Sequence, residues 1–130
     1  MNVRRDRGAT AVEFALVFPL LLIMLFAIID FGWVLNQQMS VTAAAREGAR
    51  YYAIHPDDGF GAAENEVNDR FGDMFDGSVS YIWGPACSAV VDDDEITLIV
   101  ETPLTDLTGW LGAFSGGANL IGTGSMRCGG

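Results

Sequence analysis

The sequence contains few of the side chains that bind metals: one histidine, His55, and two cysteines, Cys87 and Cys128. The cysteines stand far apart, and neither lies in a CxxC or Cys/His spacing, so a zinc site is not expected. No serine lies in a GxSxG motif or a comparable nucleophile turn. The sequence therefore predicts neither a catalytic centre nor a metal or cofactor.

Positive charge is scarce beyond residue 35, where four arginines accompany fourteen carboxylates. The first 35 residues hold three arginines and three carboxylates, so the formal net charge of −10 belongs entirely to the rest of the chain. An acidic domain repels the phosphate backbone, which excludes a nucleic-acid partner. Acidic runs such as Asp92–Glu95 lack the alternating ligand spacing of a calcium loop, and we expect them to form solvated turns.

One long apolar run, residues 14–35, is interrupted only by Pro19, Asp30 and Gly32. As a helix its 22 residues reach about 33 Å, enough to cross a hydrocarbon core of about 30 Å. Pro19 is expected to kink this helix, and Asp30 is expected to lie near the outer headgroups. Arginines precede the run, so the positive-inside rule places the N-terminus in the cytoplasm and the acidic part outside.

The helix is expected to continue beyond the membrane to Tyr52, because residues 36–52 contain no proline and are rich in helix formers. Small residues follow one face of this part and allow another element to approach closely: Val41, Ala44, Ala45, Gly48 and Ala49. A stop and turn follow at residues 55–59. The predicted organisation is residues 1–8 as a leader, 9–52 as the helix, and 53–130 as an extracytoplasmic domain.

The pattern beyond residue 59 predicts a short helix and then strands. Apolar residues at helical spacing run from Phe60 to Met74, and period-two alternation follows at residues 79–83 and 96–100. A last strand is expected over residues 119–128. For residues 104–114, packing against the core is favoured over contact with the membrane surface. The predicted fold is α+β and pilin-like: a long helix, with its first half transmembrane, packed with a short helix on a small antiparallel sheet.

A distinctive combination stands at the N-terminus, where a basic octapeptide ends in Gly8 and a carboxylate, Glu13, follows five residues later. A secretory signal peptide has a shorter apolar core with its cleavage site after that core. Here the candidate processing point precedes the apolar run. Cleavage after Gly8 would leave the helix on the mature protein.

The stretch Gly8-Ala9-Thr10-Ala11-Val12-Glu13-Phe14 resembles the cleavage motif of type IV prepilins of the tight-adherence class. Together with the following helix and residues 45–50, it resembles the TadE-like pseudopilin family. The resemblance implies cleavage by a prepilin peptidase, Ala9 as the new N-terminus, and a role for Glu13 in subunit recognition or assembly. Major pilins of this class have Tyr where Phe14 stands and almost no domain after the helix, which implies a minor or accessory subunit.

The prediction is therefore a structural protein of pilus assembly, not an enzyme, with other pilin subunits and a membrane assembly platform as partners. We expect it in the bacterial inner membrane or in the pilus itself. In an oxidising compartment Cys87 and Cys128 are expected to form a disulfide. The alternatives are an uncleaved membrane-anchored binding or scaffold domain, and a small anchored hydrolase that uses carboxylates or His55.

Overall fold

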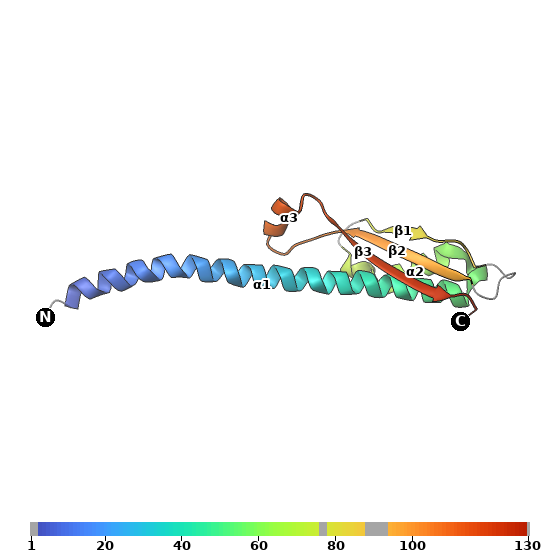
Figure 1. The fold of residues 1–130 in the computed structure, drawn as a ribbon, viewed down its shortest axis with the longest axis horizontal. Helices are drawn as coiled ribbons and strands as arrows, with labels where there is room; N and C mark the ends of the chain where they lie inside the picture. Colours follow the sequence, from blue (N-terminus) through green and yellow to red (C-terminus); the bar gives the residue numbers. More distant parts are fainter. Residues whose placement is uncertain (1–2, 76–77, 88–93, 130) are drawn as a thin grey trace.

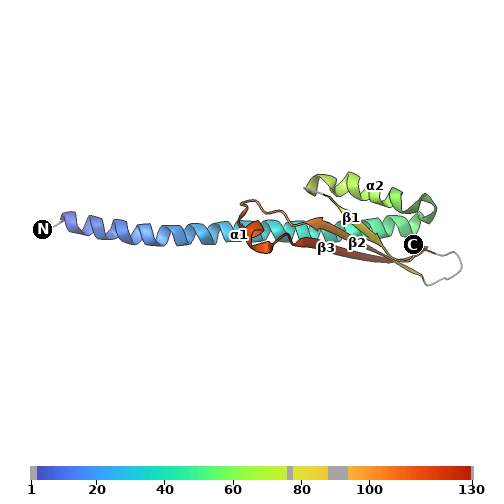
Figure 2. The same cartoon turned by 90° about the horizontal axis from the view of Figure 1, so that it is seen from above.

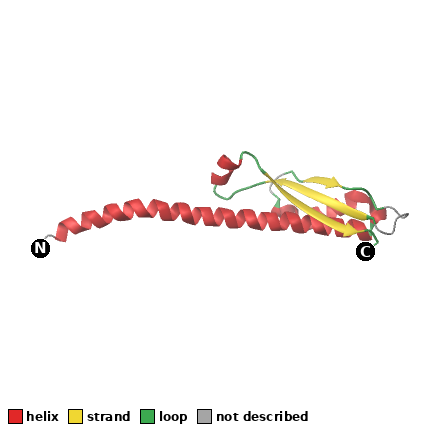
Figure 3. Ribbon diagram, in the orientation of Figure 1, coloured by secondary structure: helices red, strands yellow, loops and turns green. Residues whose placement is uncertain are grey.

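The computed structural model describes residues 3–75, 78–87 and 94–129. Within them a long helix, a short helix and a small antiparallel sheet confirm the predicted α+β class (Figure 3). The helices and strands are α1 (Val3–Ile54), α2 (Gly59–Phe71), β1 (Ser80–Trp83), β2 (Glu95–Pro103), α3 (Trp110–Ser115) and β3 (Asn119–Arg127). Single turns of 3-10 helix, Pro56–Asp58 and Gly72–Met74, flank α2.

Helix α1 is longer at both ends than the predicted span of residues 9–52. It begins at Val3, within the segment predicted to be the leader, and ends at Ile54. Its end coincides with the expected stop, because Pro56 lacks a backbone N–H and disfavours helical geometry in the residue before it. The chain stays helical through Pro19, and Figure 1 shows a gentle bend in the N-terminal part of α1.

The sheet has the order β1-β2-β3, with both pairs antiparallel. In β2 buried and partly exposed residues alternate, so Ile96, Leu98 and Val100 all face the core. The predicted turn over Asp92–Glu95 lies partly outside the described residues, since Asp92 and Asp93 are not described and Glu95 already belongs to β2.

The sheet packs along the C-terminal half of α1, and α2 runs back beside the same half (Figure 2). The predicted small-residue face of α1 makes this contact: Val41, Ala45 and Ala49 are buried against β2 and β3. On β3 the inward positions nearest the helix are glycines. A Cβ on Gly122 would lie 2.5 Å from the Val41 carbonyl oxygen, so only glycine permits this separation between helix and strand.

A second cluster closes the far end of the domain. Tyr52 of α1 stacks on Phe60 of α2 with ring centroids 4.5 Å apart, and Phe60 stacks on Trp83 of β1 at 4.8 Å. The indole Nε1 of Trp83 donates a 2.8 Å hydrogen bond to Glu64, so its polar edge is satisfied. These contacts join α1, α2 and the sheet edge.

Residues 104–116, hereafter the strap, connect β2 to β3 and include α3. Leu104 packs against the core, but Leu107 is exposed, and α3 lies beyond the end of the sheet, toward the N-terminal half of α1 (Figure 1). The favoured prediction that this segment packs against the core therefore holds for Leu104 and is wrong for Leu107. The loop before α3 is held by α1 instead.

Candidate functional site

The predicted processing and assembly residues all lie on one uninterrupted stretch of α1. Gly8, Ala9, Glu13 and Phe14 are exposed, and nothing else in the described structure lies within 4 Å of the position that a Gly8 Cβ would occupy. The Phe14 ring stacks on Phe18, one turn along, at 5.3 Å. Gly8, Ala9 and the Glu13 carboxylate are thus not covered by the rest of the described structure.

The apolar part of α1 makes little contact with the rest of the chain. Its most apolar 18-residue window has a mean hydropathy of 2.8, and none of that window is buried within the protein. An apolar helix of this length without protein cover suits a membrane span. Among the described residues of α1, Asp30 is the first that is buried.

Asp30, which is predicted to lie near the outer headgroups, is covered by the strap. It is 1% exposed, and its Oδ2 accepts a hydrogen bond from the hydroxyl of Thr108 in the strap. Its Oδ1 is buried and accepts no hydrogen bond within the described structure. About two turns further along α1, Gln37 and Thr105 bond to each other twice, once through each end of the Gln37 amide. No local sequence pattern predicts these contacts, because the partners are 78 and 68 residues apart.

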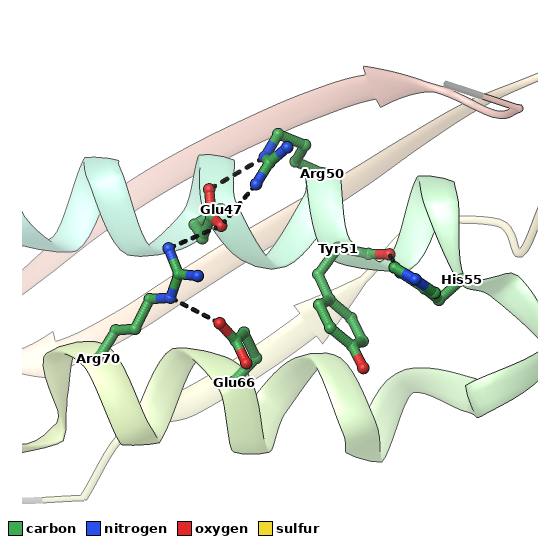
Figure 4. A network of polar contacts seen from close by, with 6 residues as sticks. All are labelled: Glu47, Arg50, Tyr51, His55, Glu66 and Arg70. Atoms are coloured by element: carbon green, nitrogen blue, oxygen red, sulfur yellow. Dashed lines mark hydrogen bonds and ion pairs between the residues drawn. The ribbon is translucent and has the colours of Figure 1, made fainter.

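A network of ion pairs joins α1 to α2 (Figure 4). Glu47 accepts hydrogen bonds of 3.0 and 3.2 Å from Arg50 and pairs with Arg70 of α2 at 3.0 Å. Arg70 also pairs with Glu66 at 2.6 Å. The hydrogen bonds from Arg50 hold the pKa of Glu47 below its usual value of 4.5, against the opposing effect of burial. Glu47 thus pairs both with Arg50 on its own helix and with Arg70 on α2.

The two cysteines meet at the end of the sheet. Cys87 and Cys128 are joined by a disulfide with 5.6 Å between their Cα atoms. The bridge connects the loop after β1 to the residue after β3, where the backbone N–H of Gly129 also donates to the Ala53 carbonyl. The hydrogen bond fastens the C-terminal segment to the end of α1, and the disulfide fastens it to the loop after β1.

His55, the residue on which the hydrolase alternative depends, is engaged locally. Its ring stacks on Tyr51 at 4.8 Å, and its Nδ1 lies 3.3 Å from the Tyr51 carbonyl oxygen (Figure 4). Two cavities in the described part of the chain, of about 380 and 360 Å³, do not include His55 in their linings. Within the described part of the chain no three His, Cys, Asp or Glu side chains converge as metal ligands.

Comparison with known families gives one match. Residues 8–50 match the family described as TadE-like protein. The resemblance drawn from the N-terminal motif is thereby confirmed over that segment, which is about a third of the chain. No curated protein and no solved structure matches the chain.

Proposed function

We propose that this TadE-like protein is a minor pilin or pseudopilin that a prepilin peptidase processes between Gly8 and Ala9. The observation that carries the proposal is one continuous helix on which Gly8, an exposed Glu13 and an uncovered apolar segment follow each other in that order. The leader of residues 1–8 would stay cytoplasmic, α1 would cross the inner membrane, and the domain with its disulfide would lie outside.

The mature chain would then carry two opposite charges at the start of α1. After cleavage the new amine of Ala9 and the carboxylate of Glu13 lie four residues apart, one helical turn, so they can pair within one chain or between neighbours. In a medium of low dielectric constant an incomplete ion pair is penalised, which favours one register between adjacent helices. Glu13 would thus help to place the subunit among other pilin subunits at the membrane assembly platform.

The test of processing is the N-terminal mass of the mature protein in its native host. Gly8→Val is expected to leave the full-length form, because a β-branched side chain at the scissile position obstructs close approach by the peptidase. Gly32→Val is the matched control, since Gly32 lies on the same helix with nothing within 4 Å of an added Cβ. A wild-type chain that retains residues 1–8 would instead support an uncleaved membrane-anchored scaffold.

The test of assembly is Glu13→Gln. This variant is expected to insert and to be cleaved as the wild type is, but to cross-link less to other pilin subunits and to form fewer fibres at equal levels of mature protein. Glu13→Asp keeps the charge and is expected to retain part of the assembly. Normal fibres with Glu13→Gln would reduce Glu13 to an interfacial residue, whereas loss of cleavage would assign it to peptidase recognition.

A further inference from the structure

The strap contacts α1 inside the apolar segment. Thr108 donates its hydroxyl hydrogen bond to Asp30, which precedes Leu35, the end of the predicted span, by five residues. At 1.5 Å per residue this contact lies about 7 Å below the end of the apolar helix. That depth falls within the 5–10 Å to which interfacial segments enter a bilayer.

Two threonines of the strap bond to α1, while its apolar residue Leu107 is exposed. Thr105 and Thr108 bond to α1, and the Asp106 carboxylate accepts the backbone N–H of Gly112 at 2.9 Å, within the strap itself. Leu107 is 57% exposed, and Phe31, which follows Asp30 in α1, is 63% exposed. The strap sequence contains no lysine or arginine that would hold it in the headgroup layer.

Asp30 supplies an independent argument for the same position. A carboxylate at this depth would meet hydrocarbon, which offers no hydrogen bonds, if the strap did not cover it. With the strap in place Asp30 is 1% exposed and accepts the Thr108 hydroxyl. In water an uncovered Asp30 carboxylate would be well solvated, so covering it with the strap would not stabilise it. The arrangement fits lipid around the strap better than it fits solvent.

We propose that the strap is a second membrane-contact element, seated beside α1 in the outer leaflet and held there by the Asp30–Thr108 hydrogen bond. Its occupant is the acyl-chain region just below the lipid headgroups. In this position the exposed Leu107 side chain would face lipid, as the exposed apolar side chains of the membrane helix do. The proposal requires membrane anchoring by α1 and does not require processing or fibre assembly.

The test measures depth in the bilayer at three positions of the full-length chain. Leu107, Ile28 and Ile82 are replaced singly by cysteine and labelled with the environment-sensitive fluorophore NBD, with the native disulfide kept oxidised. The proteins are reconstituted in vesicles of phosphatidylethanolamine and phosphatidylglycerol that contain lipids spin-labelled on the acyl chain. Ile28, 66% exposed on α1, reports the membrane span, and Ile82, 48% exposed on β1, is the matched apolar control outside it.

NBD at position 107 is expected to emit at shorter wavelength and to be quenched by the acyl-chain spin labels, as at position 28, whereas NBD at position 82 is not. Adding Thr108→Val to Leu107→Cys is expected to shift the emission toward that of position 82. If position 28 is quenched and position 107 behaves like position 82, the strap does not contact lipid and the proposal fails. Unchanged quenching at position 107 with Thr108→Val would overturn the holding role of the Asp30–Thr108 bond.

Discussion

The contact between β3 and α1 leads to a direct test of the packing, by the replacement Gly124→Ala. A Cβ built on Gly124 lies 2.4 Å from the carbonyl carbon and oxygen of Ala45 and 2.5 Å from the Arg46 nitrogen. All three atoms belong to the backbone of α1, so no side chain can rotate away to make room. The whole strand must move off the helix, or the helix must bend.

The expected cost follows from this geometry. Insertion of one methyl group into a well-packed core typically costs about 1–3 kcal/mol, and a rigid backbone neighbour favours the upper part of that range. A loss of about 2 kcal/mol corresponds to a fall of about 8–16 °C in the melting temperature of a domain of this size. Gly61→Ala is the matched control, because Gly61 is an exposed position in α2 with open space around an added Cβ. There the same methyl group is expected to stabilise by about 0.4–1 kcal/mol.

The assay is thermal unfolding of the oxidised full-length protein in detergent, followed by near-ultraviolet circular dichroism. The aromatic cluster of Tyr52, Phe60 and Trp83 contributes to this signal, so the signal changes when the tertiary packing of the domain is lost. Gly124→Ala should melt well below the wild type, and Gly61→Ala at or above it. Equal melting temperatures for Gly124→Ala and the wild type would show that helix and strand are not as close as described.

Three other outcomes are expected. Replacing Cys87 and Cys128 by serine opens a loop of about 42 residues and should cost about 4 kcal/mol in the chain-entropy model, and free thiols found by alkylation of the secreted wild-type protein would refute the bridge. Hydrogen bonds from arginine lower the pKa of Glu47 in the folded state. The ionised Glu47 therefore stabilises the fold fully above its unfolded-state pKa, and this stabilisation is lost as the pH falls through the folded-state pKa. Glu47→Gln should make the stability less dependent on pH in that window, with an effect below about 1 kcal/mol at neutral pH. Thr108→Val removes the donor to buried Asp30 and should lower the free energy of unfolding by about 1–3 kcal/mol, measured by denaturant titration.

Local patterns predicted most of the fold. The apolar run and the small residues after it have helical spacing, and the period-two alternation at residues 96–100 appears as β2 with the expected inward face. These features depend on neighbours a few residues apart, which a sequence displays directly. The prediction placed the start of α1 too late, at Ala9 and not at Val3. The leader differs from the helix in its charge, but it contains no residue that prevents a helix from beginning earlier.

Contacts between distant segments could not be predicted. Thr108 is an ordinary polar residue in a stretch whose glycines weaken any helical pattern, and Gly109 adopts a positive φ of 75° that only the folded strap reveals. In the sequence Asp30 is only a charged residue within an apolar run. Such a residue can lie at the membrane interface or can be buried as a hydrogen-bond acceptor. Similarly, the spacing of Gly122 and Gly124 marks an inward face of β3, but the helix that this face touches becomes apparent only in the structure.

The division of α1 into two surfaces has a consequence for the proposed assembly. Up to Ile29 the described helix carries large exposed side chains, and from Val41 to Ala53 it buries small ones against the sheet and α2. The domain therefore depends on the second half of α1 for its core and leaves the first half, including Glu13, without protein cover. A subunit that moved from the bilayer into a fibre would exchange lipid for neighbouring helices along this first half. The folded domain would not have to open, because its core contains no residue of that half.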